Sequence, residues 1–170
     1  ADALPLRIAG GLHALHLSGE EPSLAPIYEG LGPNNVAELL GEAIERHEPY
    51  LMPWLDGPPQ TNEAGRSSSF AAAFLWLVDR GLPRNFDLME IGSSAGINLM
   101  MRRYGYDLGG VSVGPKNANL RLKPEWRGDP PPGTGFDIVG AVGCDTAPVD
   151  LTDKAQALRL KAYIWPEFTE

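Results

Sequence analysis

The chain has 170 residues, 43% of them hydrophobic and 21% charged, a composition typical of one soluble globular domain rather than of a disordered chain. Its net charge of -8 would repel phosphate backbones, and the only close cationic pair, Arg102 with Arg103, is expected on a solvated helix face. We therefore predict no nucleic-acid partner. Cys144 is the single cysteine, so intrachain disulfides and zinc sites built on several thiolates are excluded, and a cytoplasmic location is expected. No apolar run reaches the ~18 residues of a membrane span, so we predict no membrane partner.

The N-terminal part of the chain has the spacing of helices. Residues 5–17 form one predicted helix, in which His13 and His16 are i, i+3 neighbours. Because no carboxylate completes a ligand set nearby, packing or surface roles are favoured for both histidines, and no metal site is predicted. A second helix is predicted over residues 35–47, with a capping-box-like pair, Asn35 and Glu38, at its start. His47 at its other end is expected to interact with the helix dipole.

A proline-rich stretch and a polar stretch follow. The prolines of residues 49–59 are predicted to exclude a regular helix there. Residues 64–80 then form a long apolar helix, predicted to pack against the strand that begins at residue 86. Gln60, Asn62 and Glu63 precede this helix. Capping, by Thr61 or Asn62, and contact with a ligand are equally compatible with such a polar cluster.

The central stretch is residues 86–99, which predict a buried strand over 86–91, a tight turn containing Gly92 and Gly96, and the start of a helix that ends near residue 104. The glycines would let a ligand approach the backbone, and the free amides of the helix would attract polar or anionic groups. A strand-to-helix turn that merely requires glycine is the equally supported alternative.

The remainder of the chain predicts a second strand and a last helix. Residues 102–135 are rich in loop residues, with a short strand at 119–123; residues 136–142 form a buried strand, and a helix runs from residue 152 to about Trp165. The predicted fold is α/β, one domain over residues 1–170. A helical region (1–83) precedes an incomplete Rossmann-like sheet (84–170), in which residues 102–135 are an insertion.

The sequence of the turn allows three functional interpretations. The dinucleotide fingerprint fits poorly, because Ser94 and Ile97 stand where it needs glycine. A nucleophile elbow would use Ser94 in Gly92-Ser-Ser-Ala-Gly96, but that fold needs a histidine after the serine, and every histidine here precedes it. Third, Glu90, Gly92 and Gly96 resemble the acid-x-Gly-x-Gly-x-Gly motif of S-adenosylmethionine-dependent methyltransferases, with Ser94 replacing the middle glycine.

The methyltransferase resemblance implies roles for particular residues. The turn would lie under the methionine portion of the cofactor, and Asp145, after the second strand, would hold the ribose hydroxyls. Asp145 is equally compatible with a turn or capping role. The cofactor contacts implied around the turn are Glu90, Gly92, Ser93, Ser94, Gly96 and Asn98, with Gln60, Asn62 and Glu63 at the rim.

Nearly the whole chain resembles an uncharacterised bacterial family, domain of unknown function 2332. The resemblance rests on Leu6–His13, Pro59–Glu63, Glu90–Leu99, Tyr104–Gly110, Glu125–Gly128 and Gly143–Asp150. It implies a methyltransferase-like fold and no particular activity. Members of that family continue past residues 165–166, so we expect a truncated member in which the strand 86–91 is a bare edge. A second copy of the chain, or the chain's own helices, would cover that edge.

We therefore expect a small-molecule ligand, S-adenosylmethionine or a related nucleoside. Methyl transfer, if it occurs, needs positioning of an acceptor rather than a nucleophilic side chain. A non-catalytic interaction module is the alternative function, and a serine hydrolase acting through Ser94 is the third.

Overall fold

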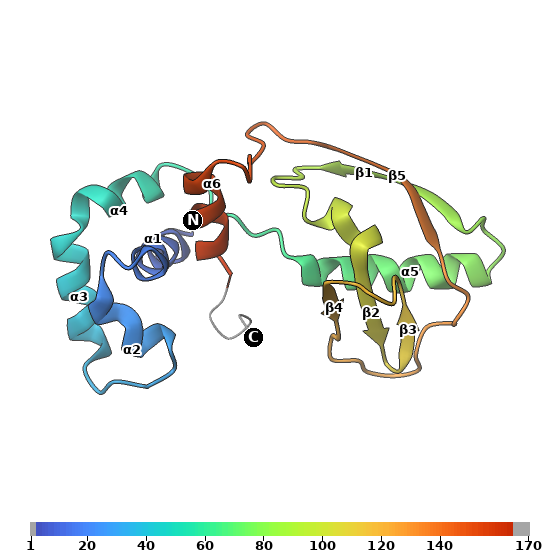
Figure 1. Ribbon diagram of the computed structural model, residues 1–170, viewed down its shortest axis with the longest axis horizontal. Helices are drawn as coiled ribbons and strands as arrows, with labels where there is room; N and C mark the ends of the chain where they lie inside the picture. Colours follow the sequence, from blue (N-terminus) through green and yellow to red (C-terminus); the bar gives the residue numbers. More distant parts are fainter. Residues whose placement is uncertain (1–2, 165–170) are drawn as a thin grey trace. The chain divides into compact units, whose positions relative to one another are not determined.

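The computed structural model describes residues 3–164, which fall into two compact units (Figure 1). The helical unit consists of the chain up to Thr61 together with the chain from Val149 on, and the mixed unit is Asn62–Pro148. The expected α/β class is confirmed as a mixed α/β structure. Organisation as a single domain stays a prediction.

The helical unit is formed by helices α1 (Leu4–Ser18), α2 (Ala25–Tyr28), α3 (Val36–Arg46), α4 (Glu48–Leu55) and α6 (Lys154–Ala162), with a 3-10 turn, η1 (Pro22–Leu24). The two predicted N-terminal helices are confirmed as α1 and α3. Gly19, at a φ of 76°, ends α1 in the left-handed conformation that glycine adopts without strain. One core cluster of this unit is aliphatic, with Leu12, Leu15, Leu24, Ala43 and Leu51 buried together, and a second contains Ala14, Trp54, Ala162 and Tyr163.

Helix α4 corrects the expectation that prolines exclude a helix from residues 49–59. Pro49 lies in the first turn, where its missing N–H would have no partner in any case. Pro53 lies inside the helix and removes one backbone bond, but Leu51 and Trp54 are buried at the same turn. Burial of these two large side chains outweighs the local propensity.

Two details at helix ends also differ from the sequence expectations. The Asn35 side chain makes no capping bond to the backbone and instead donates to Glu38 Oε2 at 3.3 Å. Helix α6 begins where Asp153 accepts bonds from the amides of Ala155 and Gln156, and it ends at Ala162. Trp165, the predicted end of this helix, lies outside the described residues.

The mixed unit contains helix α5 (Ser67–Asp79), the 3-10 turns η2 (Ala64–Arg66) and η3 (Asn98–Arg103), and strands β1 (Asn85–Ile91), β2 (Tyr104–Leu108), β3 (Val111–Val113), β4 (Leu120–Leu122) and β5 (Asp137–Cys144). Within this unit β1 pairs with β5 in parallel, and β2 lies between antiparallel β3 and parallel β4. The predicted helix 64–80 is confirmed as η2 followed by α5. Helix α5 packs on β1, where the ring of Phe74 stacks on the ring of Phe86 with 4.3 Å between the ring centroids.

Residues 102–135, the predicted insertion, contain more regular structure than expected. The strand expected at 119–123 is confirmed as β4, but β2 and β3 form a hairpin in a stretch expected to be loop. Gly109 and Gly110 make its turn, with φ angles of 65° and 94° that suit a two-residue hairpin connection. Tyr106 and Leu108 of β2 are fully buried in the core beside Leu75 of α5.

Strand β1 is half exposed, which corrects the prediction of a buried strand. Its inner face packs on the α5 core, whereas Met89 and Ile91 on its outer face are 85% and 92% exposed. Val142 of β5 pairs with Met89, so the two strands share this outer face. Among the described helices, none is long and apolar enough to span a membrane.

Candidate functional site

Residues 92–96, the glycine turn, follow the carboxyl end of β1 and are anchored to the end of β5. The amides of Gly92 and Ser93 both donate to the Cys144 carbonyl oxygen, at 2.8 and 3.2 Å. Gly92 and Gly96 have φ angles of 75° and 71°, so the turn needs the conformational freedom of glycine at both positions. The Gly96 amide closes the turn by donating to the Ser93 carbonyl oxygen.

Ser94 has a left-handed backbone, with a φ of 54°. For a residue with a Cβ this conformation costs about 1–2 kcal/mol. Its amide donates to Asp145 Oδ2 at 2.7 Å, which ties the turn to the residue that follows β5. Hydrogen bonds from the amides of Ala147 and Ser94 hold the pKa of Asp145 below its usual range, so the group is a carboxylate at neutral pH.

Three polar side chains converge on the same end of β1. Asn98 donates to Glu90 Oε1 at 2.8 Å, and Asn62 donates to the Gly92 carbonyl oxygen at 3.0 Å. The structure therefore brings together most of the predicted residues from three separate stretches of the sequence: Glu90, Gly92, Ser93, Ser94, Gly96, Asn98, Asp145 and Asn62. Asn62 acts on the turn rather than as a helix cap.

Three buried oxygen atoms at this site have no hydrogen-bond partner among the described residues. They are Glu90 Oε2, Asn98 Oδ1 and Ser94 Oγ. Leaving such a group unsatisfied costs about 1–3 kcal/mol. The carboxylate and amide oxygens can only accept, so the group that would satisfy them must be a donor, whereas the serine hydroxyl can also donate.

The roles of the other two predicted rim residues stay predictions. Gln60 belongs to the helical unit, and the exposed Glu63 side chain makes no hydrogen bond in the mixed unit. The helix expected after the turn is also corrected. Residues 98–103 form the short 3-10 turn η3, because the chain re-enters a strand at Tyr104, so no long helix presents free amides to a ligand.

Sequence reasoning missed two supports of the turn. One is the Cys144 carbonyl oxygen, a backbone acceptor with no residue signature. The other is the Tyr104 hydroxyl, which donates to the Ile97 carbonyl oxygen at 2.9 Å and holds the segment between the turn and η3. An aromatic residue eight positions after the end of a glycine turn carries no recognisable signal of this role.

A family model described as "Uncharacterized protein conserved in bacteria (DUF2332)" matches residues 1–170. The chain belongs to the DUF2332 family. No curated protein and no solved structure matches this DUF2332 chain. The family description names no reaction, and the geometry of the glycine turn is the strongest indication of function in the mixed unit.

Proposed function

We propose that this DUF2332 protein binds S-adenosylmethionine or a closely related nucleoside at the glycine turn. The observation that carries the proposal is the group of unsatisfied oxygens at the turn, Glu90 Oε2, Asn98 Oδ1 and Ser94 Oγ. A carboxylate and an amide oxygen side by side suit an ammonium group, and the serine hydroxyl suits a carboxylate. These are the two charged groups of an α-amino acid.

Asp145 supports the nucleoside part of the proposal. Its Oδ2 is held by the Ser94 amide and its Oδ1 by the Ala147 amide, yet each carboxylate oxygen has a further lone pair for a ribose hydroxyl. An ionised Asp145 is the form needed for that bond.

The strand arrangement supports the same location. Ile91 and Cys144 are paired at the carboxyl ends of two parallel strands, and the turn and Asp145 follow directly. In open α/β sheets, ligands bind beyond the carboxyl ends of parallel strands. We infer that β1 and β5 are part of a Rossmann-like sheet. If the site is catalytic, the sulfonium supplies the methyl group, and the chain's contribution is to bind and orient the donor.

Calorimetric titration of the free chain with S-adenosylmethionine and S-adenosylhomocysteine tests the proposal. We expect saturable micromolar binding that weakens about tenfold in Glu90→Gln and in Asp145→Asn, the loss of about 1.4 kcal/mol each. Asp87→Asn is the matched control, because Asp87 lies exposed on the same strand, and we expect it to bind as the parent does. Absence of heat at millimolar ligand, or equal binding by all variants, would exclude this site.

A second candidate is a non-catalytic interaction module that pairs with another copy of the chain. The outer face of β1 and β5 favours it, because Met89, Ile91, Val139 and Val142 are all more than half exposed. Apolar sheet faces of this kind mark association surfaces. Hydrolysis with Ser94 as the nucleophile is the third candidate function. It is the least favoured, because residues 62–148 contain no histidine that could act as the general base.

A further inference from the structure

The mixed unit contains a second hollow, away from the carboxyl ends of β1 and β5. It has a volume of about 740 Å³ and is lined by the start of β5, the end of η3, strand β3 and the segment before β1. This size is within the ~300–1,000 Å³ of small-molecule sites. None of the glycine-turn residues lines it.

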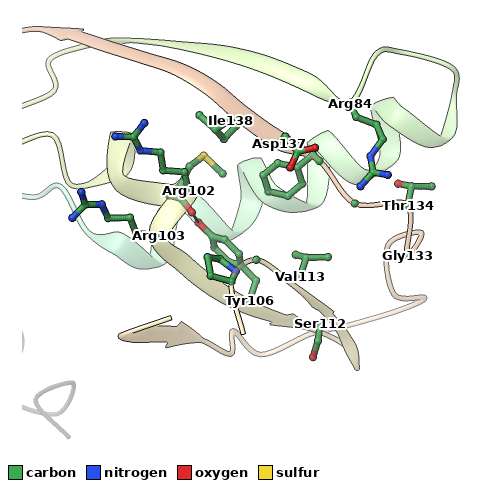
Figure 2. A pocket seen from close by; sticks show the side chains of 15 residues that line it. Arg84, Arg102, Arg103, Tyr106, Ser112, Val113, Gly133, Thr134, Asp137 and Ile138 are labelled. Atoms are coloured by element: carbon green, nitrogen blue, oxygen red, sulfur yellow. Dashed lines mark hydrogen bonds between the residues drawn. The ribbon is translucent and has the colours of Figure 1, made fainter. Parts of the chain in front are cut away.

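Three arginines line this hollow, which we call the arginine hollow. Arg102 and Arg103 lie together on one side and Arg84 on the other, beside Thr134 and Asp137 (Figure 2). Asp137 is the single acidic residue of the lining. In an acidic chain with a net charge of -8, three positive charges against one negative charge are a local reversal of sign.

The guanidinium groups of these arginines are available to a ligand. Within residues 62–148 none of the three makes a side-chain hydrogen bond or an ion pair, although Lys123 and Arg127 of the same unit both have carboxylate partners. The absence of a side chain at Gly135 leaves room for the Arg84 guanidinium, because a Cβ on residue 135 would lie 2.6 Å from a terminal nitrogen of Arg84. Arg102 and Arg103, which the sequence placed on a solvated helix face, both line this hollow.

The floor of the arginine hollow is apolar. Met101 and Tyr106 are buried beneath it, and Val113, Phe136 and Ile138 are partly buried around it. A cationic rim over an apolar floor is complementary to a molecule that has an anionic end and an apolar body. Guanidinium groups bind phosphate oxygens with particular geometric fit.

We propose that the arginine hollow binds a small organic phosphate, with Arg84, Arg102 and Arg103 contacting the phosphate and the apolar floor contacting the organic body. The site is separate from the glycine turn and does not depend on the function proposed there. A nucleic acid is disfavoured as the source of phosphate by the charge of the whole chain.

The test uses the full chain and fluorescence titration with 1-naphthyl phosphate. Inorganic phosphate lacks the apolar body and 1-naphthol lacks the charge, so each should bind at least about tenfold more weakly than the complete probe. We expect Arg84→Gln and the double substitution Arg102→Gln with Arg103→Gln each to weaken binding of 1-naphthyl phosphate by about tenfold or more. Arg127→Gln removes the same charge from an arginine that already pairs with Glu125, and less than about a twofold change is expected.

Several results would overturn the proposal. These are the absence of saturable binding at millimolar probe, equal weakening by Arg127→Gln, and equal affinity for 1-naphthol. Tighter binding of a short single-stranded oligonucleotide, with the same arginine dependence, would assign the surface to nucleic acid instead. Titration of the arginine variants with S-adenosylmethionine separates the two sites, since an effect of the arginines there would contradict their independence.

Discussion

Glu21 is the buried carboxylate on which we expect the pH stability of the helical unit to depend. Only 5% of its side chain is exposed, and both oxygens are occupied. Oε1 accepts from the amide and hydroxyl of Ser23, and Oε2 accepts from Arg46 and from His47 Nε2 at 3.0 Å. These partners, the Ser23 bonds first, lower the pKa of Glu21 from 4.5 to about 2.

The size of the effect follows from that shift. Each pKa unit corresponds to 1.36 kcal/mol, so the upper limit is about 3 kcal/mol. Half of the Arg46 side chain is exposed and its charge is screened by solvent, so we expect about 1–2 kcal/mol. Because the folded pKa lies below the unfolded one, this stabilisation is complete above pH 4.5 and is lost as the pH falls from 4.5 towards 2.

The assay is urea unfolding of the parent and of Glu21→Gln, followed by the tryptophan fluorescence of the chain, at several pH values between 7 and 3. We expect Glu21→Gln to lower the free energy of unfolding by about 1–2 kcal/mol at pH 7 and by progressively less at acid pH. Glu42→Gln is the control, because Glu42 is an exposed partner of the same Arg46 at 3.7 Å, and we expect less than about 0.5 kcal/mol. A difference between parent and Glu21→Gln that stays constant with pH would refute the assignment to the carboxylate charge.

Two further predictions concern the mixed unit. Gly114→Ala should lower the free energy of unfolding by about 3 kcal/mol, because the φ of Gly114 is 91° and an added Cβ would overlap the Tyr104 carbonyl oxygen. The control is Gly110→Ala, which should cost about 1 kcal/mol, because Gly110 has a similar φ of 94° but open space around it. Equal losses of stability in urea unfolding would contradict the overlap at Gly114. If two chains pair through the outer face of β1 and β5, Ile91→Lys should convert the dimer to a monomer in gel filtration, because it places a charge on that face. The control Phe70→Lys changes a residue of α5 that is 52% exposed and should leave the dimer intact. A monomeric parent chain would exclude pairing through the outer face.

The sequence predicted the elements whose local signals agree with their packing. Helix α5 and strands β1 and β5 are long and periodic, and glycine in the turn is required by backbone angles that no other residue adopts easily. The meeting of Asp145 with Ser94 could be anticipated because both follow parallel strands. It required an assumption that β1 and β5 are neighbours, which the sequence does not contain.

The failures have particular physical reasons. Helix α4 forms despite Pro53 because tertiary burial of Trp54 outweighs propensity. Strand β1 carries apolar residues on both faces, Phe86 and Leu88 on the inner face and Met89 and Ile91 on the outer face, and this pattern does not indicate whether a second layer covers the outer face. The β2–β3 hairpin was readable in principle from Gly109-Gly110 between strand-forming residues, but the surrounding glycines and prolines favoured a loop.

Glu21 and Glu90 differ in how completely the protein satisfies their carboxylate oxygens. Both oxygens of Glu21 are satisfied by the protein, as expected of a structural carboxylate. Glu90 has one oxygen bonded to Asn98, whereas its other oxygen is buried and has no partner among residues 3–164. Glu90→Gln removes an incompletely satisfied charge, so we expect the free chain to keep its melting temperature or to gain in stability while ligand binding weakens. Thermal unfolding with and without S-adenosylmethionine measures both effects. If Glu90→Gln destabilised the free chain as much as Glu21→Gln does, Glu90 would be a structural residue, and the unsatisfied oxygen would no longer argue for a ligand.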